Sequence, residues 1–281
     1  EEATAAADMY VAAVGRIAAD PVLRERVNVS LKLTQMGQDV RMGNGRAAPS
    51  PDTPRWPRPG KGATPDNAGD WDDAFLRSNV KRILDAAKVH DVFVRFDMEG
   101  TPHTQRTLDF FRSLWEEGYR NIGIVLQSYL YRTAHDAREA NLLGARVRLC
   151  KGAYHEPAEY AFQDKADVDS GFVTVMKMLL SDGVYAGIAT QDEAMVRATR
   201  DYAREKDLPA SGWEFQMLYG IRRDLQRQLV DAGYNLRVYV PFGDAWYPYL
   251  MRRMAERPAN VLFIVNSVLR ESPLGFMFAR K

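Results

Sequence analysis

Short apolar runs alternate with longer amphipathic segments along most of this chain, and this alternation restricts the fold more than any other feature. Seven runs rich in β-branched residues are predicted strands, at 27–33, 92–97, 122–127, 146–150, 184–189, 213–217 and 236–240. The segments between them carry apolar residues three and four apart and are predicted helices, at 72–89, 103–117, 133–143, 168–181, 191–206 and 221–232. Strands that alternate with helices are typical of βαβ units, so the sequence predicts a parallel sheet.

Four segments lie outside this alternation. Residues 2–19 are Ala-rich with helical spacing and predict a helix, which Asp20-Pro21 ends. Residues 244–256 predict another helix, and the apolar segment 261–265 is compatible with a strand or a packing helix. Residues 43–71 contain six prolines and five glycines without a hydrophobic period, so we predict a solvated, dispensable loop insertion.

Length and composition exclude several classes of protein. The 281 residues, 46% of them hydrophobic, can bury one large core, and a parallel barrel of about 250 residues is one domain, so we expect a single domain over 1–281. A net charge of +1 gives no reason to expect a nucleic-acid partner. The single Cys150 excludes an internal disulfide and indicates a reducing compartment such as the cytoplasm. No apolar run approaches the ~20 residues of a transmembrane helix.

Polar residues stand at or near the carboxyl ends of the predicted strands. They are Lys32, Asp97, Gln127, Arg148 with Lys151, Thr190 with Gln191, Gln216, and Tyr239. Active sites of parallel barrels gather at this end of the sheet. Loop-proximal residues are polar in any case, but a full ring of hydrogen-bonding and charged side chains favours a functional site. The four histidines show no zinc-ligand spacing, so no metal site is predicted. Cys150 lies among apolar neighbours and is predicted to be a buried thiol rather than a nucleophile.

A second polar constellation lies near the C-terminus. On a helix over 244–256, Tyr249, Arg252, Arg253 and Glu256 share one face. Two guanidinium groups side by side suit a small carboxylate, and Glu256 can fix one of them in place. A clamp for a small anion and a solvated Arg-rich helix end are equally compatible with this stripe alone.

Six blocks of the sequence resemble those of one enzyme family, in the family's order. Arg148-Leu149-Cys150-Lys151-Gly152-Ala153-Tyr154 is similar to the Arg-Leu-Val-Lys-Gly-Ala-Tyr signature of flavin-dependent proline dehydrogenases. The other blocks begin at Ser30, Arg95, Ile124 and Glu214, and the last is the Tyr-x-x-Arg-Arg-x-x-Glu element that ends at Glu256. Six blocks in register cover nearly the whole chain, so the chain is identified as a member of this family.

The resemblance implies a distorted (β/α)8 TIM-like barrel that binds FAD and oxidises L-proline to Δ1-pyrroline-5-carboxylate. It also implies a quinone as electron acceptor, reached by a cytoplasmic protein at the surface of the inner membrane. Relatives carry an Asp-x-Leu-Gly-Glu strand end before the first helix, and Glu1-Glu2-Ala3 resembles its last residues. The first barrel strand is therefore expected to be missing from this chain.

The family's site residues transfer by position. The resemblance implies catalytic roles for Asp97 and Arg148. It implies substrate contacts from Lys32, Asp97, Tyr239, Tyr249, Arg252 and Arg253. It implies cofactor contacts from Met98, Gln127, Arg148, Lys151, Gly152, Ala153, Thr190 and Gln191. Glu1, Glu2 and Glu256 are expected to gate the pocket, with Glu1 or Glu2 near Arg252 or Arg253.

Three departures from the family pattern leave alternatives open. Gln191 replaces a usual His and cannot carry charge, Cys150 replaces a usual Val, and the segment 43–71 is shorter in most relatives. Oxidation of a related cyclic amino acid such as 4-hydroxyproline is one alternative, although Tyr239 favours proline. A non-catalytic barrel that serves as a scaffold is the other.

Overall fold

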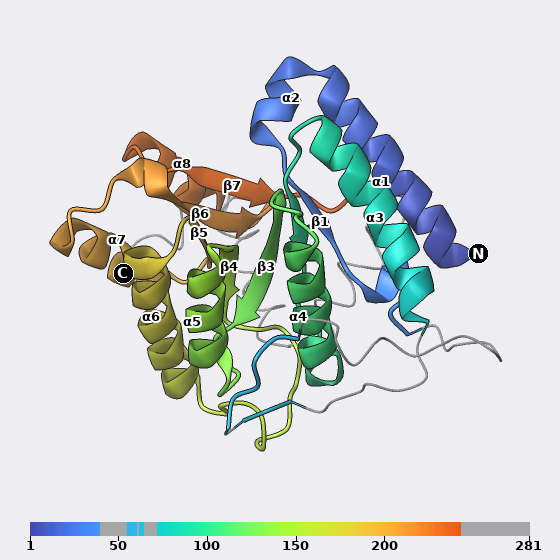
Figure 1. Ribbon diagram of the computed structural model, residues 1–281. Coiled ribbons are helices and arrows are strands. Elements are labelled where there is room, and N and C mark those ends of the chain that lie inside the picture. The colour runs from blue at the N-terminus through green and yellow to red at the C-terminus, as the bar shows by residue number, and fades with distance from the viewer. Residues whose placement is uncertain (40–54, 61, 65–71, 243–281) are drawn as a thin grey trace, which may run out of the picture.

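Seven parallel strands form one curled sheet in a computed structural model that describes residues 1–39, 55–60, 62–64 and 72–242 (Figure 1). Each strand pairs with the next one along the chain. The strands are β1 (Val29–Leu31), β2 (Val94–Phe96), β3 (Ile122–Gln127), β4 (Arg146–Cys150), β5 (Ala186–Ala189), β6 (Trp213–Leu218) and β7 (Leu236–Tyr239). All seven predicted strands and their parallel arrangement are confirmed.

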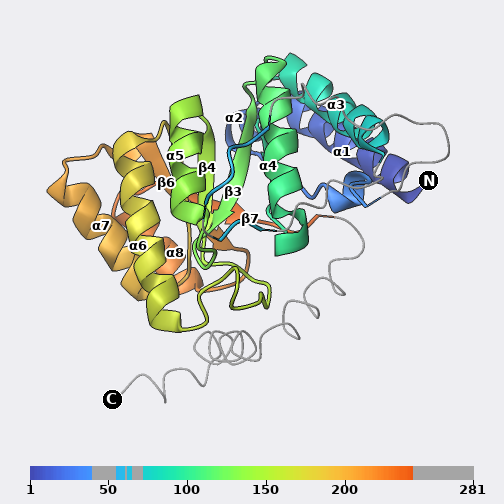
Figure 2. The ribbon, with the colours of Figure 1, turned by 60° about the horizontal axis from the view of Figure 1, so that its bottom comes forward.

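Helices follow one another around the outside of this sheet (Figures 1 and 2). They are α1 (Glu2–Ala19), α2 (Pro21–Arg26), α3 (Asp73–Val89), α4 (Thr101–Glu116), α5 (Thr133–Leu143), α6 (Lys165–Asp182), α7 (Glu193–Glu205) and α8 (Arg223–Asp231). Helix α1 packs beside α3, and α6 packs between α5 and α7. A parallel curled sheet inside a layer of helices is the architecture of the predicted barrel.

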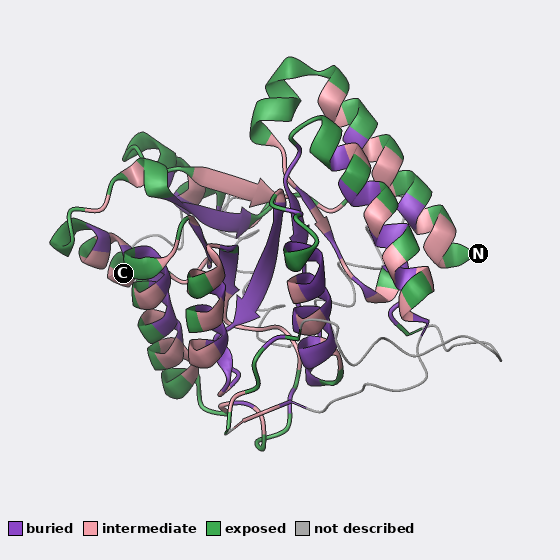
Figure 3. Cartoon of the chain, in the orientation of Figure 1, coloured by how far each residue is buried: buried purple, intermediate pink, exposed green. Residues whose placement is uncertain are grey.

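Alternation along the strands directs large apolar side chains toward the helices and polar side chains toward the inside of the sheet. Figure 3 shows that the central strands are buried, whereas the outward surfaces of the helices are exposed. Leu31, Phe96, Ile124, Leu149 and Phe215 have no exposed surface and contribute to the large apolar core, which includes buried residues of the surrounding helices. The residues before and after them along each strand, such as Ser30, Arg148 and Gln216, point to the concave inner side of the curled sheet, which is called the hollow below. The hollow therefore collects the polar residues that the sequence predicted at the strand ends.

The short helix α2 is not predicted from the sequence, because Asp20-Pro21 was interpreted only as the end of the preceding helix. Asp20 is also the N-cap of α2, and its carboxylate accepts hydrogen bonds from the backbone N–H groups of Val22 and Leu23. Pro21 occupies the first helical position, where the N–H group that proline lacks would have no hydrogen-bond partner within the helix.

The helix predicted over 244–256 and the segment 261–265 lie outside the described residues.

The described parts of the predicted insertion, 55–60 and 62–64, contain no helix or strand, but they are not simply solvated. Trp56 is 1% exposed, and its indole N–H donates to Asp136 Oδ1 at 3.0 Å. Arg132, which is fully buried, donates to Asp136 Oδ2 at 2.6 Å and to Thr64 Oγ1 at 2.7 Å. The expectation of a wholly solvated loop is wrong at these residues, whereas the single domain over 1–281 stays a prediction.

None of the helices in the described part of the chain combines the length and the apolar character that crossing a membrane would require.

Candidate active site

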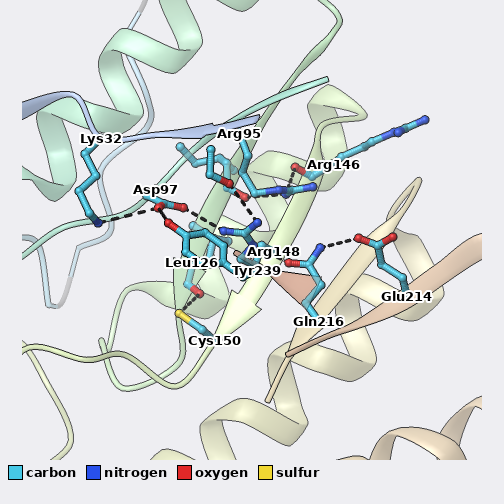
Figure 4. A network of polar contacts seen from close by, with 12 residues as sticks. Lys32, Arg95, Asp97, Leu126, Arg146, Arg148, Cys150, Glu214, Gln216 and Tyr239 are labelled. Atoms are coloured by element: carbon cyan, nitrogen blue, oxygen red, sulfur yellow. Dashed lines mark hydrogen bonds and ion pairs between the residues drawn. The ribbon is translucent and has the colours of Figure 1, made fainter. Parts of the chain in front are cut away.

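Arg148 lies at the centre of the hollow (Figure 4). It projects inward from β4, and only 8% of the residue is exposed. Its three guanidinium nitrogens reach three other strands. Nη1 donates to Asp97 Oδ1 at 2.9 Å, Nη2 to Ser30 Oγ at 3.1 Å, and Nε to Gln216 Oε1 at 2.5 Å. These contacts fix the orientation of the Arg148 guanidinium plane. A fixed plane lets the side chain direct its charge toward one ligand.

Asp97 connects Arg148 to the rest of the predicted substrate site. Its Oδ2 accepts a hydrogen bond from the Tyr239 hydroxyl at 3.0 Å, and Lys32 Nζ lies 3.8 Å from the same oxygen. The Arg148 guanidinium also lies over the Tyr239 ring, 5.2 Å from its centroid. The structure thus brings together four predicted residues from β4, β7 and the ends of β1 and β2.

Buried charges of both signs act on their neighbours in the hollow. Burial, with a further contribution from the charge of Arg148, lowers the pKa of the Arg95 guanidinium to about 9. Arg95 is buried and donates to the backbone carbonyls of Ile124 and Arg146. Burial and the negative charge of Asp97 raise the pKa of Tyr10, whose hydroxyl donates to the Ser30 carbonyl at 3.0 Å. Charges in this part of the molecule are therefore poorly screened by water.

A cavity of about 1790 Å³ opens onto these groups. Lys32, Asp97, Arg148 and Tyr239 line it together with the acids at the start of the chain, Glu1 and Glu2. Both acids are exposed. Their expected proximity to Arg252 or Arg253 stays a prediction, because Tyr249, Arg252, Arg253 and Glu256 lie outside the described residues.

The predicted cofactor residues of the signature follow β4. Lys151 Nζ donates to Asp169 at 2.5 Å and to Asp192 at 2.7 Å. Gly152 has a φ of 111°, and a Cβ there would lie 2.5 Å from the Tyr129 ring. Ala153 is half-buried. The Cys150 thiol, whose pKa burial raises to about 11, is not activated for nucleophilic attack.

The remaining predicted cofactor residues lie at the carboxyl ends of β2, β3 and β5. Met98 and Gln127 are buried, and the Gln127 amide donates to the Glu99 carbonyl at 3.0 Å. Thr190 is buried, and its hydroxyl accepts from the Asp192 N–H at 3.1 Å. Gln191 is half-buried beside it. Their contacts to a cofactor stay predictions.

The structure places Ser30 and Glu214 in the network, and neither of them was predicted from the sequence as a site residue. Gln216 was predicted only as one of the polar residues near the strand ends. A signal for Glu214 was present, because Glu214 and Gln216 are polar residues two apart in an otherwise apolar strand and must face the same side. Among the described residues, no group of three or more His, Cys, Asp or Glu side chains could bind a metal ion.

The family model for proline dehydrogenase matches residues 1–266. The chain belongs to the proline dehydrogenase family. It is 42% identical over 202 residues to proline dehydrogenase 1 of Bacillus subtilis, a match that covers 72% of this chain and 67% of the relative. It is 43% identical over 194 residues to proline dehydrogenase of Deinococcus radiodurans, which covers 69% of this chain and 63% of that protein. The predicted family and enzyme class are confirmed.

Solved structures of proline utilization A (PutA) proteins share the fold. The PutA protein of Bdellovibrio bacteriovorus superposes with a TM-score of 0.72 at 24% identity, covering 100% of this chain and 30% of that one. A bifunctional PutA protein superposes with a TM-score of 0.71 at 23% identity, covering 99% and 29%. The chain therefore spans less than a third of these proteins, and at this identity the likeness supports the predicted distorted barrel and nothing further.

Proposed function

We propose that this member of the family oxidises L-proline to Δ1-pyrroline-5-carboxylate with FAD as its cofactor. One observation carries the proposal: Lys32, Asp97, Arg148 and Tyr239 converge on one cavity at the positions that the family resemblance assigns to substrate and cofactor. FAD, when bound, supplies the acceptor for the hydride that leaves proline.

The residues present fit this cofactor. Gly152, just after β4, has a φ of 111°, and the Tyr129 ring packs where a Cβ would lie, so glycine lets the backbone turn sharply directly after the Lys151 cation, whose charge suits a phosphate. Lys151, Gly152 and Ala153 would bind the pyrophosphate region, and Met98, Gln127, Thr190 and Gln191 would contact other parts of FAD. Arg148 is buried, so its positive charge is little screened by water and would stabilise an anionic reduced cofactor.

The substrate residues would orient proline. Asp97 presents a carboxylate to the secondary ammonium group, and its own orientation is fixed by Arg148 and Tyr239. Tyr239 and Tyr249 would pack on the ring, and Arg252 with Arg253 would bind the carboxylate. Positioning of this kind supplies much of the rate of a hydride transfer.

Steady-state oxidation of L-proline with an artificial electron acceptor, while the flavin absorbance is followed, tests the proposal. We expect bound FAD that proline bleaches, and a loss of turnover of at least about 100-fold in Asp97→Asn. Asp201→Asn is the matched control, because Asp201 is an exposed residue of α7 that forms an ion pair with the exposed Arg204. A chain without FAD, or one that prefers 4-hydroxyproline, would contradict the proposal.

We further propose that electrons leave to a quinone at the surface of the inner membrane, as the family resemblance implies for a cytoplasmic protein. Reduction of a soluble quinone analogue, measured with and without anionic lipid vesicles, tests this acceptor. Quinone reduction that depends on proline is expected. Turnover with the artificial acceptor but none with any quinone would contradict it.

A further inference from the structure

Glu214 of β6 lies beyond Gln216 as seen from Arg148 and is 3% exposed (Figure 4). Arg237 donates to it twice, from Nε to Oε1 at 2.7 Å and from Nη2 to Oε2 at 2.9 Å. The Tyr185 hydroxyl donates to Oε2 at 3.1 Å. Burial would raise the pKa of Glu214, but the hydrogen bonds and charge of Arg237 outweigh burial and hold that pKa below its ordinary value. Glu214 is therefore ionised at neutral pH and can only accept hydrogen bonds.

Gln216 lies between this carboxylate and Arg148. Its Nε2 donates to Glu214 Oε1 at 2.6 Å, and its Oε1 accepts from Arg148 Nε at 2.5 Å. A carboxylate only accepts and a guanidinium only donates, so one orientation of the Gln216 amide satisfies both neighbours and the reversed one satisfies neither.

We propose that Glu214 is a positioning residue, which fixes the orientation of the Gln216 amide and through it the orientation of Arg148. The inference rests on the proposed function, because it assigns Arg148 to the cofactor. With glutamine at position 214, the side chain could donate to Gln216 Oε1 and permit the reversed amide. The Gln216 amide nitrogen would then face Arg148 Nε, donor against donor.

A glycine on the neighbouring strand allows a test without any change of charge. Gly187 of β5 lies beside the Gln216 amide, and a Cβ at Gly187 would overlap Nε2 and the amide carbon. That amide is the far end of a flexible side chain, so Gly187→Ala should displace it while the strand still folds. Gly212→Ala is the matched control, because within the described part of the chain its Cβ would meet nothing nearer than Pro209 at 4.0 Å.

The midpoint potential of the bound flavin distinguishes positioning from simple charge. Removing the negative charge in Glu214→Gln should by itself favour an anionic reduced cofactor and raise the potential. Loss of the Arg148 orientation should lower it. We expect a lower potential in Glu214→Gln, Gln216→Leu and Gly187→Ala alike, an unchanged one in Gly212→Ala, and a kcat about 10- to 100-fold lower with KM little changed.

A second readout needs no flavin. The Nε–H resonance of Arg148, identified by its loss in Arg148→Lys, should be protected from exchange in wild type and lose that protection in Glu214→Gln and Gly187→Ala. A raised potential in Glu214→Gln, a wild-type potential in Gly187→Ala, or an unaltered Arg148 resonance in both would overturn the inference. A wild type that binds no FAD would refute the proposed function instead, while the resonance still tests the positioning.

Discussion

At the scale of single residues, Gly152 of the signature sequence is required by the conformation of the backbone at that position. Its φ of 111° is a conformation that residues with a Cβ rarely adopt, and the Tyr129 ring occupies the space where a Cβ would lie. We expect Gly152→Ala to lower the free energy of unfolding by about 1–3 kcal/mol from the backbone alone, and more from the collision with Tyr129. Urea unfolding measures the stability, and the ratio of flavin to protein absorbance measures FAD occupancy, which should also fall.

Gly15→Ala serves as the control for this prediction, because a Cβ at Gly15 in helix α1 would meet no atom within 4 Å. Alanine is favoured over glycine inside a helix, so this variant should be as stable as wild type or slightly more stable. Wild-type stability and full FAD occupancy in Gly152→Ala would show that the loop after β4 adapts freely.

Lys151 determines a pH dependence at the same scale. Burial tends to raise the pKa values of Asp169 and Asp192, but the hydrogen bonds and charge of Lys151, with a smaller contribution from Lys165, outweigh it and hold both pKa values below their ordinary value. A carboxyl whose pKa is lower in the folded state stabilises the protein above its unfolded pKa, and this contribution disappears as the pH falls through the folded pKa.

We therefore expect wild type to lose stability below about pH 4 more steeply than Lys151→Met, by up to about 1 kcal/mol because the groups are partly exposed. Urea midpoints measured at a series of pH values test this. Lys206→Met is the control, because Lys206 is half-exposed and forms an ion pair with the exposed Glu205 beside the Tyr202 ring. Parallel pH profiles for Lys151→Met and wild type would contradict the prediction.

At the scale of elements, the described part of the segment 55–64 is attached to helices α4 and α5. The backbone N–H of Trp56 donates to Asp109 of α4 at 2.8 Å, its carbonyl accepts from Gln105 at 3.2 Å, and its indole donates to Asp136 of α5. The ring packs edge-on against Phe111, with centroids 6.2 Å apart. This segment thus contributes a large buried side chain to the outer layer of the barrel.

We expect Trp56→Ala to cost about 3–5 kcal/mol of unfolding free energy, and Trp56→Phe about 1–3 kcal/mol because it leaves Asp136 short of a donor. Thermal and urea unfolding measure both. Gly60→Ala should be neutral, since a Cβ there would meet no atom within 4 Å. A Gly-Ser linker in place of 43–71 that leaves the melting temperature unchanged would contradict this prediction and support the expectation of a dispensable loop.

The contrast between elements explains what could be predicted from the sequence. Strands β3 and β4 and helix α5 match their predicted ranges to the residue. The apolar patterns of the two strands give way to the polar residues Gln127 and Lys151, and α5 ends at Gly144, whose left-handed conformation glycine favours. Trp56 carries no such signal, since burial of a side chain from an irregular segment depends on distant partners. Asp97 and Arg148 were predicted in the site because they lie near the ends of predicted strands. Their contact with each other depends on how neighbouring strands align, and no local sequence pattern determines that register.

At the scale of the whole molecule, the polar network joins parts of the sheet that backbone pairing leaves apart. The Asp97–Arg148 pair crosses the hollow between the end of β2 and β4, and Tyr239 connects β7 to Asp97. Arg237 of β7 also donates to the Arg26 carbonyl, just before β1. The two edges of the curled sheet are therefore linked through the same side chains that form the candidate site, so stability and function share residues.

Because the same side chains link the sheet and form the candidate site, we expect strong energetic coupling between Asp97 and Arg148 in a double-mutant cycle of stability. Asp97→Ala should cost about 3–5 kcal/mol of unfolding free energy, because it leaves a buried guanidinium without its carboxylate. Arg148→Leu removes the opposite charge, so the double variant should be more stable than the sum of the two single effects predicts, by more than about 1 kcal/mol.

Urea unfolding followed by both tryptophan fluorescence and far-UV circular dichroism measures the cycle and checks that one transition is observed. The pair of Asp201 and Arg204 is the control, because both side chains are about two-thirds exposed and their coupling should be near zero. Additive effects at Asp97 and Arg148 would mean that the hollow admits enough water to solvate each charge separately. In that case the network would orient the site without stabilising the barrel.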